Sequence, residues 1–143
     1  MNSKKYGIIL EGTDGVGKTT TIEKLKEQGI ICKDRSKDII SKNMLFDVPM
    51  ETRVKVYDDY LRNSDDIVIF LINNDKEELM NRIYSRDVIS DFDLQAYEYN
   101  QLYVDTYKYM EAHNMLHEKL FLVDCTNLTL DEQVEKVKEV INA

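Results

Sequence analysis

The sequence predicts an α/β protein, a three-layer sandwich in which a short parallel sheet is covered by helices on both faces. Four short apolar runs are nearly continuous in Ile, Val, Leu and Phe rather than alternating, which is typical of strands buried on both sides. Helical patterns lie between these runs. The 143 residues are 43% hydrophobic and 32% charged, with one proline, and show no linker or repeat. We therefore expect a single domain over residues 1–143.

The four predicted strands are residues 6–10, 29–32, 67–72 and 120–123. Right-handed crossovers restrict how such strands can be ordered. We expect the first strand to be central, flanked by the second and third, with the fourth beyond the third.

Start signals and apolar stripes mark the helices. Asp75 with Glu78, and Thr129 with Glu132, have the spacing of capping boxes, and Pro49 suits a helix start. The predicted helix after Thr129 has an apolar stripe made of Leu130, Val134, Val137 and Ile141. The predicted helix after Pro49 has a buried face made of Val54, Tyr57 and Leu61. A longer helical segment, about 91–114, carries Tyr99, Tyr103 and Tyr107 in register.

Charge and cysteine content exclude several classes of function. The net charge of −8 argues against a nucleic-acid polymer or an anionic membrane as partner, because a protein that binds such a surface needs an excess of Lys and Arg. Cys32 and Cys125 have no metal-ligand spacing around them and are expected to be reduced, buried strand residues. With no long apolar segment or signal peptide in view, the expected location is the cytoplasm.

The strongest motif lies between the first strand and the first helix. Gly12-Thr13-Asp14-Gly15-Val16-Gly17-Lys18-Thr19 is a complete G-x-x-x-x-G-K-[ST] P-loop. Its glycines let backbone N–H groups converge on an anion, and the helix N-terminus adds its positive dipole end. Lys18 is expected at the β- and γ-phosphates of ATP, Thr19 at Mg²⁺ and Thr20 at the α-phosphate. The alternative is a tight turn with Lys18 on a solvated face.

The longer string Leu10-Glu11-Gly12-Thr13-Asp14-Gly15-Val16-Gly17-Lys18-Thr19-Thr20 resembles the signature of the thymidylate kinase family, E-G-x-[DE]-G-x-G-K-T-T. The resemblance implies a P-loop NTPase fold and phosphoryl transfer from Mg·ATP to a deoxynucleoside monophosphate, dTMP above all. It also implies that Asp14 reaches the sugar 3′-hydroxyl of the acceptor nucleotide.

The pair Asp34-Arg35 closes the second predicted strand. It is similar to the family's Asp-Arg pair, in which the arginine binds the acceptor phosphate and the aspartate lies near the metal. An Arg fork can hold phosphate oxygens bidentately, and a carboxylate at this edge of a parallel sheet can hold the water shell of Mg²⁺. The alternative is a surface ion pair that contributes little.

Two further regions have counterparts in the family. The segment at about 82–92 corresponds to the lid, whose arginines close over the transferring phosphoryl group; Arg82 and Arg86 are the candidates, because Gly15 stands where some members carry a P-loop arginine. The alternative is two solvated arginines. Tyr99 and Tyr103 correspond to an aromatic face at the acceptor pocket, although tyrosines at helical spacing more often pack into the core.

The chain also departs from the family. It is shorter, with four expected strands rather than five, and no Arg-Glu-Pro motif follows the first helix. It resembles the small phage-type deoxynucleotide kinases of the superfamily, which leaves thymine preference and a homodimer open. The alternatives are a kinase of another small acceptor and a nucleotide-binding module without turnover. A nucleic-acid end kinase is a weaker third, because the charge provides no basic track for a strand.

Overall fold

A computed structural model describes residues 7–13, 15–34 and 48–142. Their centre is a four-stranded sheet with all strands parallel, in the order β2-β1-β3-β4. The strands are β1 (Ile8–Glu11), β2 (Lys33–Asp34), β3 (Ile67–Ile72) and β4 (Leu120–Asp124). The order predicted from the sequence is confirmed, as is the three-layer α/β arrangement.

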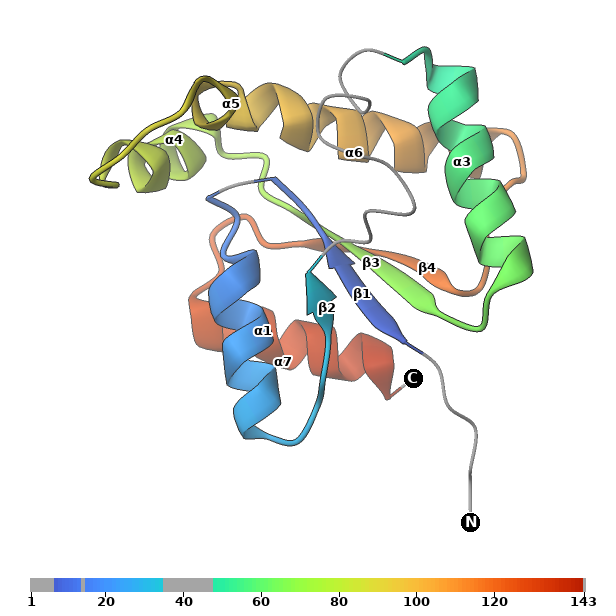
Figure 1. The fold of residues 1–143 in the computed structure, drawn as a ribbon, viewed down its shortest axis with the longest axis horizontal. Coiled ribbons are helices and arrows are strands. Elements are labelled where there is room, and N and C mark those ends of the chain that lie inside the picture. Colours follow the sequence, from blue (N-terminus) through green and yellow to red (C-terminus); the bar gives the residue numbers. More distant parts are fainter. Residues whose placement is uncertain (1–6, 14, 35–47, 143) are drawn as a thin grey trace.

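The helices cover both faces of the sheet (Figure 1). They are α1 (Lys18–Glu27), α3 (Met50–Asn63), α4 (Lys76–Tyr84), α5 (Asp91–Leu94), α6 (Ala96–Ala112) and α7 (Leu130–Ile141). On one face α1 and α7 lie side by side; on the other lie α3 and α6. Within the described residues, no helix combines the length and apolarity needed to cross a bilayer.

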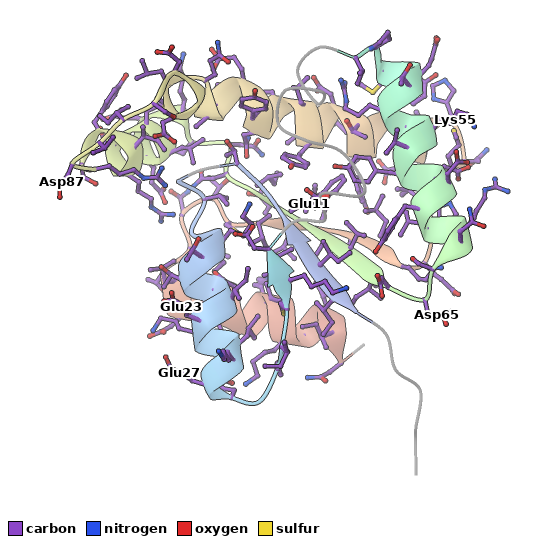
Figure 2. The ribbon with its side chains drawn as sticks, viewed as in Figure 1. Glu11, Glu23, Glu27, Lys55, Asp65 and Asp87 are labelled. Atoms are coloured by element: carbon purple, nitrogen blue, oxygen red, sulfur yellow. The ribbon has the colours of Figure 1, made fainter. Side chains whose placement is uncertain are left out.

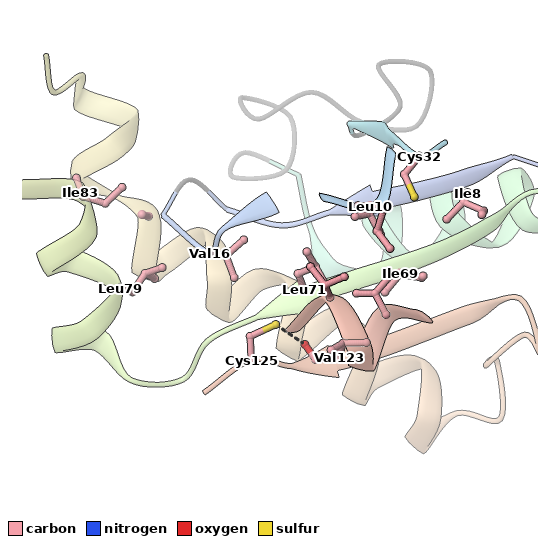
Figure 3. Close-up of a cluster of buried hydrophobic side chains, with 14 of the residues drawn as sticks. Ile8, Leu10, Val16, Cys32, Ile69, Leu71, Leu79, Ile83, Val123 and Cys125 are labelled. Atoms are coloured by element: carbon pink, nitrogen blue, oxygen red, sulfur yellow. Dashed lines mark hydrogen bonds between the residues drawn. The ribbon is translucent and has the colours of Figure 1, made fainter. Parts of the chain in front are cut away.

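Each face has its own hydrophobic core, because neighbouring residues of a strand point to opposite sides. In β1, Leu10 packs into the core under α1 and α7, whereas Ile9 packs into the core under α3 and α6. The central strand β3 divides in the same way, with Ile69 and Phe70 on opposite faces. Figure 3 shows the first core, where Val16 from the loop after β1 meets α4 side chains. The loop is therefore anchored in the core.

The second strand lies further along the chain than residues 29–32. Gly29 has φ +84° and ends α1 in a Schellman arrangement: its N–H donates to the Lys26 carbonyl, and the Ile30 N–H donates to the Leu25 carbonyl. Residues 29 and 30 thus belong to the helix stop, and Ile31 is 66% exposed. Within the described residues 29–34, the pairing with β1 is made by Lys33 and Asp34. The sequence prediction was wrong there because an apolar run was assigned to the sheet without regard to the glycine.

The two predicted capping boxes differ in the structure. Thr129 and Glu132 form a complete reciprocal box at the start of α7. The Asp75 side chain accepts from the Glu78 N–H, but the Glu78 side chain turns away from the cap. The segment predicted as one helix is divided into α5 and α6.

Both cysteines are free and buried, but neither lies in a strand. Cys32 precedes β2, and Cys125 follows β4, where its Sγ lies 3.6 Å from the Val123 carbonyl oxygen (Figure 3). Burial raises the pKa of Cys32 to about 11 and that of Cys125 to about 12. These thiols are packing residues rather than nucleophiles.

Candidate functional site

The segment that carries the motif, residues 12–19 and here called loop 12–19, joins β1 to α1 and includes the first two residues of α1. Its described residues, 12, 13 and 15–19, lie at the carboxyl end of the central strands. Gly15 and Gly17 have φ values of +86° and +90°, a conformation that favours glycine. A Cβ atom on Gly17 would lie 2.8 Å from Leu130 Cδ2 and 3.1 Å from Gln133 Nε2. The loop therefore depends on glycine twice, for its backbone turn and for its close approach to α7.

Three carbonyl groups of this loop accept hydrogen bonds from side chains on three different helices. Lys18 Nζ donates to the Gly12 carbonyl oxygen at 3.0 Å, and Arg82 of α4 donates to the Gly15 carbonyl oxygen at 3.2 Å. Gln133 of α7 donates to the Val16 carbonyl oxygen at 3.1 Å. Binding an anion requires a loop whose N–H groups, not its carbonyls, face the ligand. Each of these three carbonyl groups is instead hydrogen-bonded to a side chain of the protein.

A pocket of about 260 Å³ opens against this loop. The α1 N-terminus contributes to its wall, so the positive end of the helix dipole faces the pocket. The lining residues are Thr13, Gly15, Gly17, Lys18, Thr19, Thr20, Arg82, Arg86 and Leu130. Glycine backbone, threonine hydroxyls and three cationic side chains form a chemistry suited to a polyanion such as a phosphate chain.

The remaining predicted ligand of a metal, Asp34, stands at the end of β2 beside Lys18. Its Oδ1 lies 3.0 Å from Lys18 Nζ, and its side chain is 57% exposed. Because β2 and β1 are parallel neighbours, the carboxyl end of β2 brings Asp34 to the same edge of the sheet as the loop. Asp34 is thus paired with Lys18, which precedes Thr19 in the chain.

The two predicted lid arginines both reach the pocket, and each pairs with a carboxylate. Arg82 lies 3.0 Å from Glu78 Oε1, and Arg86 lies 3.0 Å from Asp93 Oδ1. The segment from Tyr84 to Asp91 is exposed throughout, and Figure 2 shows Asp87 at its outer tip. Residues 82–92 therefore form an outlying arm next to the loop, with one arginine at its base and one along it.

The two predicted acceptor-binding tyrosines lie elsewhere. Tyr99 and Tyr103 are 4% and 3% exposed and pack in the core under α3 and α6. Tyr103 and Tyr57 both donate hydrogen bonds to the buried carboxylate of Glu11, at 3.1 and 3.4 Å. Figure 2 shows Glu11 at the end of β1 toward α6. Neither Tyr99 nor Tyr103 lines the pocket, so the structure brings them to Glu11's side of the sheet rather than to the loop. The predictions for Asp14 and Arg35 fall outside the described residues.

Three residues of the site were not found from the sequence. Leu130 counted there only as part of an apolar stripe, and Gln133 left no signal, because its partner Val16 is 117 residues away. Glu78 was assigned to a cap, whereas its carboxylate accepts hydrogen bonds from Arg82 and Asn73. Side chains that support a loop from distant elements have no local pattern to reveal them.

Comparisons with known proteins name no family for this chain. No protein-family model matches it, and no curated protein matches it either. Among solved structures, the chain is similar to the crystal structure of an uncharacterized protein from Eubacterium ventriosum, with 14% identity over 97% of this chain and 99% of that chain. The TM-score of 0.47 is too low for this likeness to carry an argument.

Proposed function

We propose that the protein transfers a phosphoryl group from Mg·ATP to a deoxynucleoside monophosphate, most readily dTMP, and releases the diphosphate. The observation that carries the proposal is the pocket at loop 12–19, where a helix N-terminus, Lys18 and two arginines from a separate helical arm surround one space. Phosphoryl transfer needs cations on several sides of one phosphate, because its transition state spreads charge over the equatorial oxygens.

The residues present fit a Mg²⁺-bound triphosphate. Gly15 and Gly17 line the pocket, and the threonine hydroxyls of its lining residues belong to the oxygen class of ligands that Mg²⁺ prefers. Lys18 already stands between the loop and Asp34. Mg·ATP supplies the phosphoryl group and neutralises part of its charge. The chain itself contributes position and charge.

Each described residue has a defined task in this proposal. Lys18 binds the phosphate chain, and Thr19 and Asp34 orient the metal and its water shell. Arg82 and Arg86 stabilise the transferring group and exclude water as the arm closes. The acceptor contacts of Asp14 and Arg35 remain predictions from the resemblance. A kinase of free nucleotides would work in the cytoplasm, without a nucleic-acid polymer or a membrane as partner.

The test is a panel of acceptors with Mg·ATP, measuring ADP and the phosphorylated product. The panel holds dTMP, dUMP, dCMP, dGMP, dAMP, thymidine and a 5′-hydroxyl oligonucleotide, and Lys18→Ala is run beside the parent. We expect a diphosphate from dTMP, little or none from the oligonucleotide, and no turnover in the folded variant. Turnover by Lys18→Ala within a few-fold of the parent would rule out the proposed role of the loop.

The same panel separates the alternatives. Product from thymidine or another monophosphate alone keeps the kinase but changes its acceptor. Specific ATP binding, lost in Lys18→Ala, with no product from any acceptor identifies a nucleotide-binding module without turnover.

A further inference from the structure

We infer that Gln133 is a positioning residue for nucleotide binding: it holds loop 12–19 in its anion-binding shape from α7 without touching the ligand. This inference rests on the proposed function of the loop. Gln133 is fully buried, whereas its neighbour Glu132 is exposed and serves the helix cap. A glutamine on the inner face of an amphipathic helix, among apolar residues, calls for a specific partner.

The partners of Gln133 lie on the two sides of the turn into α1. Its Nε2 donates to the Val16 carbonyl oxygen at 3.1 Å and to Thr21 Oγ1 at 2.9 Å. A carbonyl oxygen can only accept, so the amide nitrogen must face it, which fixes the orientation of the side chain. One amide group therefore ties the last residues of the loop to the first turn of the helix that follows.

The Val16 carbonyl is one of the three held on protein partners, and its donor differs from the other two. Lys18 and Arg82 are charged and line the pocket, so a bound phosphate competes for them. Gln133 is neutral and is not a lining residue. It can keep its hydrogen bond whether or not the pocket is filled, which is the behaviour needed to hold the loop's shape before the ligand arrives.

The first turn of α7 is itself fixed against the loop. The capping box of Thr129 and Glu132 sets the helix start, and Asp131 pairs with Lys24 of α1 at 3.4 Å. Leu130 lies so near Gly17 that a Cβ there would approach its Cδ2 to 2.8 Å. Gln133 thus acts from a rigid support.

Gln133 also leaves a buried acceptor unused. Among the described residues, its Oε1 has no hydrogen-bond partner. Gln133→Met removes this unpaired acceptor but also deprives the Val16 carbonyl of its donor, so its two effects on folding stability oppose each other. A purely structural role therefore predicts that Gln133→Met changes both the thermal midpoint and the Kd of Mg·ATP only slightly. A positioning role predicts a selective loss of nucleotide affinity.

The experiment measures the Kd of Mg·ATP by calorimetric titration and, separately, the thermal midpoint of the free protein. The variants are Gln133→Met and Gln133→Glu, with Gln28→Met, an exposed position at the C-terminal end of α1, as control. We expect Gln133→Met to weaken Mg·ATP binding about tenfold, because the free loop then spends most of its time outside its binding-competent shape. The midpoint of its free form should stay near that of the parent, and Gln28→Met should match the parent in both measurements.

Gln133→Glu adds a readout that packing alone does not change. A protonated glutamic acid can donate to the Val16 carbonyl, but an ionised one cannot. Burial raises a carboxyl pKa, so the affinity of Gln133→Glu for Mg·ATP, relative to that of the parent, should fall as the pH rises from about 6 to about 8. This ratio also tests the inference if Gln133→Met folds poorly.

The outcomes separate two failures. If the parent binds Mg·ATP and Gln133→Met binds within twofold of it, or the Gln133→Glu ratio is flat with pH, the inference is wrong and the proposed function stands. If the parent shows no specific binding of Mg·ATP, both fail.

Discussion

The two ends of the sheet hold charged groups in different ways. At the amino end, Asp58 accepts from Arg62 at 2.8 Å and lies 2.7 Å from His117 Nε2, and Asp66 accepts from the Tyr60 hydroxyl and from the Gly7 N–H. At the carboxyl end, the cations Lys18, Arg82 and Arg86 also pair with carboxylates, but they line an open pocket.

This difference separates stability from function. The amino-end carboxylates join α3 to the starts of β3 and β4, so their hydrogen bonds contribute to folding. Under the proposed function, the carboxyl-end cations exchange partners such as the 57% exposed Asp34 side chain for phosphate oxygens. Substitutions at the two ends should therefore affect different measurements.

The largest effect is expected for Arg82→Met, compared with Arg62→Met. Both arginines pair with a carboxylate one helical turn earlier, Glu78 and Asp58. Loss of a cation at the transferring phosphate should lower kcat by about 100-fold or more, whereas loss of the Arg62 surface pair should leave kcat unchanged. Steady-state kinetics on both variants checks this. An equal effect of the two substitutions would contradict the division between the ends.

The next largest effect is expected for Gly17→Ala, on the Kd of Mg·ATP, with Gly29→Ala as the comparison. The two glycines share a positive φ, +90° and +84°, but a Cβ on Gly17 meets α7, whereas a Cβ on Gly29 meets nothing within 4 Å. Both variants carry the backbone strain of about 1 kcal/mol. Only Gly17→Ala should also displace the loop, and it should weaken Mg·ATP binding by at least tenfold. Titration of both proteins at equal folded concentration measures this, and equal Kd values would show that the contact with α7 has no role.

The same comparison shows what the sequence could predict. The place of Lys18 and Thr19 beside a pocket could be predicted because the P-loop pattern is local, whereas their roles with ATP and Mg²⁺ stay predictions. The sheet order followed from the apolar runs and the crossover rule. The second strand was misplaced because Gly29 ends a helix through backbone conformation. Gln133 and Glu78 could not be found, since their roles depend on contacts across the fold. A local sequence motif could therefore be recognised, whereas the side chains that support it from distant elements could not.

A smaller effect, on stability alone, is expected for Asp58→Ala. The substitution leaves His117 and Arg62 without their shared carboxylate and should lower the free energy of unfolding by about 2 kcal/mol. The neighbouring Asp59→Ala is the control, because Asp59 makes an exposed pair with Lys55 and should cost less than about 0.5 kcal/mol. Urea denaturation measures both. The Kd of Mg·ATP should be the same in the two variants. A higher Kd in Asp58→Ala would show that the amino end of the sheet affects binding at the carboxyl end.

The smallest effect concerns pH. The hydrogen bond from the Tyr60 hydroxyl, with that from the Gly7 N–H, holds the pKa of Asp66 below its usual range, although burial opposes this. The hydrogen bond with His117, supported by Arg62, lowers the pKa of Asp58. A carboxyl group whose pKa is lower in the folded protein stabilises the fold above the unfolded-state pKa, about 3.9, and loses that contribution as pH falls through the folded value.

Unfolding free energies should therefore decline as the pH drops below about 5, and Asp66→Asn should show a shallower decline than the parent. The exposed neighbour Asp65, at the turn between α3 and β3 in Figure 2, provides the control variant Asp65→Asn, which should follow the parent. Urea denaturation from about pH 3 to 7, a range that spans the ordinary pKa of an aspartate side chain, measures the three proteins. If Asp66→Asn and the parent decline alike, the hydrogen bonds at the amino end do not hold this carboxylate in its ionised form, and its contribution to the fold is packing alone.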